Sequence, residues 1–349
     1  MTTATVLGAG AMGSAICNPL VEAGWNVRLW GTWLDDHLID AIEHHQPHPR
    51  TGAIINSEVT TFRSDELATA LADADVVIMA VASVGVAEIT RRALSGIAQA
   101  DALWLTSKGF YETDSGEILL LPEAIRQIAK NEGVTSLPPI VAIAGPVKAN
   151  ECAQGEPTAT IFGCSDAEVA HRYAREAASS SYAIQHTQDE VGVEICAPMK
   201  NVYAIALGIS DGLEEATERP HHNLKAATFA QAVREMSLLG AAMGADPATA
   251  FGLAGVGDLE VTGLSGRNKV YGMRIGRGEK PDEALAEMAR LEQTVEGVPA
   301  AGLAKKLIDQ LNLDPKNDLP LFAAVDELLN SPVDDVKHVI AQAVLPRSK

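Results

Sequence analysis

The chain has 349 residues, of which 47% are hydrophobic and 21% charged, a balance typical of globular proteins. Its formal net charge of −19 argues against nucleic acid or an anionic membrane as a partner. Four dispersed cysteines without CxxC spacing argue against a metal centre, and no run of about 18 apolar residues predicts a membrane span. Because no secretory signal pattern opens the chain, we expect a cytoplasmic protein.

Strand and helix patterns alternate over the first part of the chain. Apolar runs predict strands at residues 4–10, 26–31, 75–81, 102–109 and 139–146, with further strands at 158–164 and 182–189. Helical spacing occupies residues 11–25, 65–74 and 84–97. Alternation of this kind predicts an α/β Rossmann domain, a mostly parallel doubly wound sheet with helices on both faces, over residues 1–190.

Strand signals almost vanish in the second part of the chain. Helical patterns follow one another at residues 191–213, 223–244, 246–255, 281–291, 300–311 and 320–330. We therefore predict an all-α C-terminal domain that binds substrate, over residues 191–349.

The stretch from Thr5 to Ala15, TVLGAGAMGSA, contains glycines with the spacing of a dinucleotide fingerprint. Gly8 permits the tight turn after the strand, Gly10 lets the backbone approach a pyrophosphate, and Gly13 allows the helix to pack on the strand. A purely structural strand-to-helix turn is the alternative. The position between a predicted strand and a predicted helix favours the cofactor interpretation.

The end of the second predicted strand carries information about the type of cofactor. Thr32 stands where a basic residue would recognise a 2′-phosphate, and no Arg or Lys follows closely in RLWGTWLDD. Asp35 and Asp36 come slightly late for the acid that binds the ribose 2′-hydroxyl. This pattern favours NAD over NADP.

Polar residues follow several of the predicted strands, where an open parallel sheet binds its ligands. Ser83, Lys108, Gly145 and Lys148 stand at such positions. Solvent-exposed loop residues are the alternative. For Lys108 the flanking Ser107 and the glycine that follows indicate a close backbone approach.

Two segments of the helical region contain polar residues that suit catalysis. Lys200 lies inside a long apolar run, where a desolvated lysine can act as a general base. Asp258 lies in a glycine-rich turn, and Arg267 beside Asn268 suits an anionic group because guanidinium binds phosphate through two hydrogen bonds.

Together these segments resemble the NAD(P)-dependent sn-glycerol-3-phosphate dehydrogenases. GAGAMG, TSKG, AGP, KNVYAIALGISDGL, GLAGVGDLEVT, RN and VEGV occur in that family's order and near its spacing. The resemblance covers nearly the whole chain. It implies reversible hydride transfer between nicotinamide and C2 of a three-carbon phosphate, a small anionic substrate.

The resemblance also implies roles for individual residues. Lys200 would accept the proton, with Asp258 as the second catalytic residue. The implied substrate-binding residues are Lys108, Gly145, Asn201, Thr262, Arg267 and Asn268. The expected cofactor-binding residues are Gly8, Gly10, Ala11, Met12, Gly13, Trp30, Thr32, Ser83, Lys108, Ala149, Arg267 and Glu296.

Three departures from the family pattern lie near the expected substrate pocket and leave alternative substrates open. Val147 replaces a usual serine, Lys148 a usual aromatic residue, and Gly266 another serine. A hydroxy acid or another polyol phosphate is an alternative substrate, and a non-catalytic NAD-binding regulator is an alternative function. His221 and His222 are interpreted as solvent-exposed rather than metal-binding. We also predict a homodimer.

Overall fold

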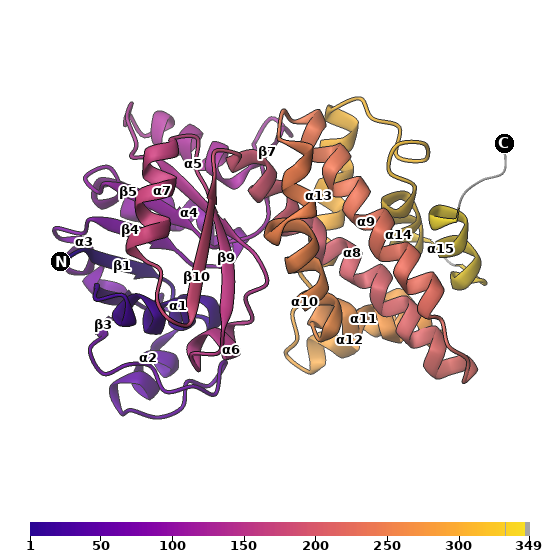
Figure 1. Ribbon diagram of the computed structural model, residues 1–349, viewed down its shortest axis with the longest axis horizontal. Helices are drawn as coiled ribbons and strands as arrows, with labels where there is room; N and C mark the ends of the chain where they lie inside the picture. Colours follow the sequence, from indigo (N-terminus) through magenta and orange to yellow (C-terminus); the bar gives the residue numbers. More distant parts are fainter. Residues whose placement is uncertain (332, 346–349) are drawn as a thin grey trace. The chain divides into compact units, whose positions relative to one another are not determined.

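The computed structural model describes residues 1–331 and 333–345, and the chain forms two compact units (Figure 1). Unit 1 comprises Met1–Tyr111 and Leu120–Glu194. Unit 2 comprises Glu112–Leu119 and Ile195–Lys349. Helix α8 (Glu190–Thr217) begins in unit 1 and continues into unit 2. The sequence analysis did not anticipate that the segment Glu112–Leu119 belongs with the helices.

Unit 1 is built on an eight-stranded sheet with the order β10-β9-β8-β5-β4-β1-β2-β3. The strands are β1 (Thr3–Leu7), β2 (Asn26–Trp30), β3 (Thr60–Phe62), β4 (Val76–Met79), β5 (Ala102–Leu105), β8 (Ile140–Ala144), β9 (Thr158–Gly163) and β10 (Tyr182–Thr187). Neighbouring strands are parallel except β8 and β9, which pair antiparallel. The predicted mostly parallel, doubly wound sheet is confirmed.

The chain builds outward from β1 to β2 and β3, and then returns to place β4 on the other side of β1. The strand order therefore reverses between β1 and β4. In open sheets of this kind, ligands bind at the carboxyl ends of the strands at this reversal. The glycine-rich turn that follows β1 lies at this point.

Helices cover both faces of the sheet because successive side chains of each strand point to opposite faces. In β4, Val76 and Ile78 pack in the core beneath α1, α2 and α7, whereas Val77 and Met79 pack in the core beneath α3, α4 and α5. The helices of unit 1 are α1 (Ala11–Glu22), α2 (Asp36–Glu43), α3 (Leu67–Leu71), α4 (Ser83–Ile97), α5 (Leu121–Asn131), α6 (Ala149–Ala153) and α7 (Ala167–Glu176).

Short elements escaped the sequence analysis. A two-stranded sheet pairs β6 (Phe110–Glu112) with β7 (Ile118–Leu120), and β3 is equally short. Segments of three residues contain too little periodicity to distinguish a strand from a loop. A 3₁₀ turn, η1 (Ser64–Glu66), precedes α3.

Unit 2 consists mainly of helices, as predicted for the C-terminal part of the chain. After α8 come α9 (His222–Ala242), α10 (Asp258–Leu264), α11 (Arg267–Gly276), α12 (Pro281–Arg290), α13 (Gly297–Gln310), α14 (Pro320–Asn330) and α15 (Val336–Val344). A 3₁₀ turn at Pro247–Phe251 and a π-helical turn at Leu253–Gly257 lead directly into α10. Wide π turns are rare and occur often beside functional residues.

Helices α8 and α11 contact each other backbone to backbone. A Cβ on Gly208 of α8 would lie 2.1 Å from the carbonyl oxygen of Lys269, and a Cβ on Gly272 of α11 would lie 2.0 Å from that of Ile205. Only glycine permits so close a crossing. The crossing holds together the N-terminal part of α11 and the middle of α8, which carry several of the predicted site residues.

Among residues 1–331 and 333–345, no helix is long and apolar enough to span a bilayer.

Candidate active site

The glycine-rich turn between β1 and α1 has the geometry of a phosphate cradle. Gly8 has φ +108°, a conformation that favours glycine, and a Cβ on Gly13 would lie 2.0 Å from the carbonyl oxygen of Gly8. Gly10 is the N-cap of α1, so Ala11 and Met12 form the first turn, whose N–H groups have no partner within the helix. The turn therefore fits the pyrophosphate of a dinucleotide.

The predicted residues at the end of β2 brace this turn. The backbone N–H of Gly8 donates to the carbonyl of Trp30 at 2.8 Å, and the Trp30 side chain is only 1% exposed. Oδ2 of Asp35 accepts from the backbone N–H of Ala9 at 3.3 Å and from the Thr32 hydroxyl at 2.8 Å. The Thr32 and Trp30 side chains are thus committed to the protein's own structure.

His48, which the sequence analysis missed, is buried against the same turn. Its Nε2 lies 3.0 Å from the carbonyl oxygen of Ala9 and 3.1 Å from Oγ of Ser14. Its Nδ1 accepts from the backbone N–H of Arg50, which places the ring proton on Nε2. Burial lowers the pKa of His48, so the ring remains neutral at neutral pH. His48 lies 39 residues from Ala9 along the chain, and no local pattern signals this contact.

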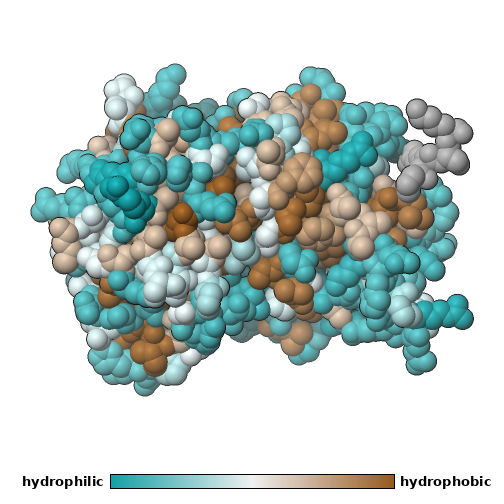
Figure 2. Space-filling view, in the orientation of Figure 1, coloured by the Kyte–Doolittle hydropathy of each residue, from teal (hydrophilic) through white to brown (hydrophobic). Residues whose placement is uncertain are grey.

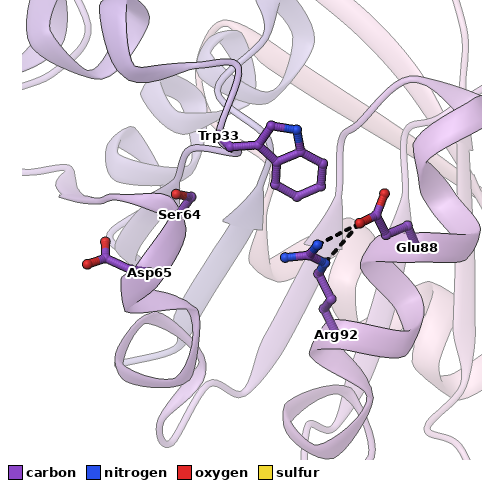
Figure 3. Close-up of a pocket in the computed structure, with 5 residues that line it drawn as sticks. All are labelled: Trp33, Ser64, Asp65, Glu88 and Arg92. Carbon is purple, nitrogen blue, oxygen red and sulfur yellow. Dashed lines mark hydrogen bonds and ion pairs between the residues drawn. The ribbon is translucent and has the colours of Figure 1, made fainter.

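A surface pocket of about 620 Å³ lies next to the residues that follow β2 (Figure 3). It is lined by Trp33, Ser64, Asp65, Glu88 and Arg92. The Arg92 guanidinium lies 4.5 Å from the centre of the Trp33 ring and donates to Glu88 at 2.7 Å. A basic group therefore lies near this strand end in space, although none follows it closely in sequence.

The segment after β5 packs closely on the segment after β4, as predicted for Lys108 and its neighbours. The Ser107 hydroxyl donates to the carbonyl of Val81 at 2.6 Å, and a Cβ on Gly109 would lie 2.5 Å from that of Ser83. Lys108 is held between these two contacts. Ser83 and Lys108, which are both predicted to bind ligand, therefore lie at the carboxyl end of the sheet.

Glu194 of α8 is a second buried group near Lys108. Burial raises the pKa of Glu194 well above its ordinary value, and the charge of Glu190 adds to this effect, while Lys108 and Arg126 oppose it. Its Oε2 has no hydrogen-bond partner among the described residues. The raised pKa favours the protonated, uncharged form of the Glu194 carboxyl.

Gly145 and Lys148 follow β8. Gly145 has φ +131°, and a Cβ there would lie 3.0 Å from Cα of Thr160 on β9, so this turn also favours glycine. Lys148 is the N-cap of α6 and lies 3.4 Å from Glu151, while Ala149 is the first residue of the helix. Val147, which replaces the family's usual serine, lies in the same turn.

Within unit 2 the predicted catalytic residues converge. The ammonium of Lys200 on α8 pairs with Oδ1 of Asp258, and it donates to the Thr262 hydroxyl at 3.1 Å. The Thr262 hydroxyl donates in turn to the carbonyl of Asp258 at 2.6 Å. Asp258 is completely buried, and Lys200 is 7% exposed. Asp258 directly follows the π-helical turn and is the first residue of α10.

A second chain of hydrogen bonds starts beside Lys200. The Asn268 amide donates to the Asn201 side-chain carbonyl at 3.0 Å, and Oδ1 of Asn268 accepts from the backbone N–H of Gly297 at 2.8 Å. Glu296 accepts from Asn201 at 3.4 Å and pairs with Arg267 at 3.3 Å. Arg267 and Glu296 are about half exposed, so a guanidinium is available at the rim of a buried lysine–aspartate pair.

The predicted site residues therefore form two groups. The glycines, Thr32, Ser83, Lys108, Gly145 and Ala149 belong to unit 1, and Lys200, Asn201, Asp258, Thr262, Arg267, Asn268 and Glu296 belong to unit 2. Chemically, the second group can hold an anion at Arg267 and exchange a proton at Lys200. His221 and His222 lie elsewhere in unit 2, within 3.2 Å of Thr217 and 3.5 Å of Glu214 respectively.

Comparison with known proteins identifies the family of this chain. Residues 3–170 match the family described as NAD-dependent glycerol-3-phosphate dehydrogenase N-terminus, and residues 189–339 match its C-terminal counterpart. This chain belongs to the NAD-dependent glycerol-3-phosphate dehydrogenase family. The resemblance seen in the sequence is confirmed.

Individual relatives of this family cover most of the chain. An NADP(+)-dependent glycerol-3-phosphate dehydrogenase of Archaeoglobus fulgidus is 35% identical, over 89% of this chain and 91% of that protein. A glycerol-3-phosphate dehydrogenase [NAD(P)+] of Halorhodospira halophila is 33% identical, over 94% of this chain and 96% of that protein. The crystal structure of glycerol-3-phosphate dehydrogenase from Coxiella burnetii superposes with a TM-score of 0.80 at 24% identity, covering 98% of both chains, which shows the shared fold.

Proposed function

We propose that this protein catalyses the NAD(P)-dependent interconversion of sn-glycerol 3-phosphate and dihydroxyacetone phosphate. The observation that carries the proposal is the buried Lys200–Asp258 pair, next to Asn201, whose amide donates to Glu296, the ion-pair partner of the half-exposed Arg267. Family membership and the glycine cradle after β1 supply the context.

The roles of the chain's own residues follow from these contacts. Bound nicotinamide supplies the hydride acceptor or donor. In the oxidation direction, neutral Lys200 takes the proton of the C2 hydroxyl, and in reduction its ammonium returns that proton and stabilises the developing alkoxide. Asp258 and Thr262 hold Nζ of Lys200 in place.

Arg267 is the candidate for the phosphate group. It begins α11, and the half-exposed Glu296 partly offsets its charge. We expect Arg267→Ala to raise KM for dihydroxyacetone phosphate by about 10–100-fold, because a charged hydrogen bond contributes about 1.5–3 kcal/mol. The same change should barely alter KM for unphosphorylated dihydroxyacetone. An equal loss with both ketones would assign Arg267 a structural or cofactor role.

NAD is the proposed cofactor in preference to NADP. The pocket beside β2 contains two carboxylates, Asp65 and Glu88, and Arg92 is already bound to Glu88. A 2′-phosphate there would meet these carboxylates without a free cation, a deficit on the order of 1–3 kcal/mol. Comparing kcat/KM for NADH and NADPH tests this, and equal or better use of NADPH would contradict it.

The decisive test is oxidation of NADH by a panel of ketones. Dihydroxyacetone phosphate should react fastest, while unphosphorylated ketones and 2-keto acids should react poorly. A keto acid as the best substrate would indicate a hydroxy-acid dehydrogenase with Lys148 as anion partner. Cofactor binding without turnover of any ketone would indicate a regulator.

We further propose that the protein is a homodimer in the cytoplasm, as an extension of the same assignment. Light scattering after size-exclusion chromatography gives the mass in solution. Fractionation of the source cells gives the compartment. A monomeric mass or a membrane-bound fraction would refute the respective part.

A further inference from the structure

Arg50 lies beside the glycine cradle although it is far from it in sequence. It belongs to the segment between α2 and β3, and its Nη1 lies 3.6 Å from the position that a Cβ on Gly10 would take. Gly10 is the N-cap of α1 and has an extended backbone. The guanidinium thus lies beside the residue that caps the start of that helix.

The segment that carries Arg50 is fastened to the cradle. His48 binds the carbonyl of Ala9 and the hydroxyl of Ser14, and its Nδ1 accepts the backbone N–H of Arg50. The carbonyl of His48 accepts the N–H groups of Thr51 and Gly52 at 3.1 and 2.8 Å. The backbone around Arg50 is therefore held by hydrogen bonds, and the residue is exposed.

The charge of Arg50 is not neutralised by the protein. Across residues 1–331 and 333–345 its side chain makes no ion pair with a carboxylate, whereas Arg63, Arg92 and Arg126 each do. The carboxylate at the turn, Asp35, already accepts from Ala9 and Thr32. An exposed, unneutralised guanidinium beside a helix N-terminus and a glycine turn suits a phosphate.

We propose that Arg50 is a phosphate-binding residue of the cofactor site and that it takes the pyrophosphate common to NAD and NADP. The inference rests on the proposed dinucleotide-dependent function. The position of Arg50 beside Gly10 indicates which phosphate of the cofactor it binds. The pyrophosphate binds at this helix N-terminus, whereas the ribose 2′ position is recognised at the end of β2. His48 acts as the positioning residue.

Direct binding measurements test this without turnover. Isothermal titration of wild type and Arg50→Gln with NADH, NADPH, ADP-ribose, adenosine 2′,5′-bisphosphate and adenosine separates the groups that each ligand carries. Arg175→Gln, which removes an exposed arginine on α7, is the matched control. Thermal midpoints confirm that each variant is folded.

The expected result is a loss of about 10–100-fold in affinity for NADH, NADPH and ADP-ribose alike, as for the loss of one charged hydrogen bond. Adenosine should bind unchanged, and the control should match wild type. A loss confined to NADPH and adenosine 2′,5′-bisphosphate would show that Arg50 reads the 2′-phosphate instead, and unchanged ADP-ribose binding would remove it from the site. Wild type that binds none of these ligands would refute the proposed function rather than this inference.

Discussion

Lys200 and Asp258 form an ion pair that packing alone does not explain. Removing two charges from water costs several kcal/mol each, so a buried pair is seldom a source of net stability. Here Asp258 is fully buried, and the pair sits beside hydrogen-bonding groups rather than in an apolar core. The proton transfer proposed for Lys200 would give this buried pair a function.

Replacing Lys200 by methionine tests that use. Lys200→Met keeps most of the side-chain length and removes the proton, so we expect kcat to fall by at least ~10²-fold. NADH affinity should stay near wild type, because the glycine cradle belongs to unit 1. Stopped-flow turnover and NADH fluorescence titration on the same sample measure both. A variant that retains its turnover would exclude Lys200 from the mechanism.

At the scale of elements, the glycine crossing of α8 and α11 supports the site. Asn201 on α8 and Asn268 on α11 are joined at 3.0 Å, and the backbones approach closely at Gly208 and Gly272. An added methyl group at either glycine meets a carbonyl oxygen of the partner helix, which is rigid backbone.

Gly272→Ala is therefore expected to destabilise the protein by about 2–3 kcal/mol through overpacking. The matched control is Gly302→Ala on α13, where a Cβ would have no atom within 4 Å. That change should stabilise the helix by about 0.5–1 kcal/mol. Urea unfolding of the three proteins gives both values. Similar effects from both substitutions would contradict the close crossing.

Asp211 joins three helices. Its carboxylate lies 2.8 Å from the ammonium groups of Lys225 on α9 and Lys269 on α11. Burial alone would raise the pKa of Asp211, but the hydrogen bonds and charges of the two lysines outweigh it and lower the pKa below 3.8. A carboxyl whose pKa is lower in the folded chain than in the unfolded chain stabilises the fold at pH values above its unfolded pKa. This stabilisation is lost as the pH falls through the folded pKa.

We expect Asp211→Asn to cost about 1–2 kcal/mol at pH 7. The difference in free energy of unfolding between wild type and variant should stay constant down to about pH 4. It should shrink below pH 3.8, the ordinary pKa of this carboxyl. Urea midpoints at pH 7, 5, 4 and 3 measure it. A gap that persists unchanged at pH 3 would show that the carboxylate's charge contributes nothing.

The sequence predicted elements and their order better than contacts between distant segments. Apolar runs identified β1, β4, β5 and β8 because burial on both faces leaves a local signature. The antiparallel pairing of β8 with β9 left no such mark, because strand direction is set by the path of the chain between the strands.

In the candidate site, too, local patterns were easier to predict than contacts between distant segments. Lys200, Asp258 and Arg267 were predicted because they lie in distinctive segments that resemble one family. Arg50 was missed because its approach to Gly10 depends on His48, whose contacts span more than 30 residues. No basic residue closely follows β2 in the sequence, whereas the folded chain brings Arg92 to Trp33.

At the scale of the whole molecule, the net charge of −19 acts against compactness. Hydrophilic residues cover most of the face seen in Figure 2. Many carboxylates are offset by neighbouring cations, as Asp40 and Glu43 are by Arg63. Like-charge repulsion among the remaining carboxylates falls as salt shortens the Debye length from about 30 Å at 0.01 M to about 8 Å at 0.15 M.

We therefore expect the thermal midpoint to rise between 0.01 and 0.5 M NaCl at pH 7.5. A variant with Glu58→Gln, Glu117→Gln and Glu292→Gln removes three exposed carboxylates that form no ion pair within residues 1–331 and 333–345. Because less repulsion remains to be screened, this variant should melt higher than wild type at 0.01 M NaCl, and the difference should narrow with salt. Differential scanning calorimetry across the salt series records both trends. A wild-type midpoint that falls with salt would mean that attractive pairs, rather than the acidic excess, dominate the electrostatics of the folded chain.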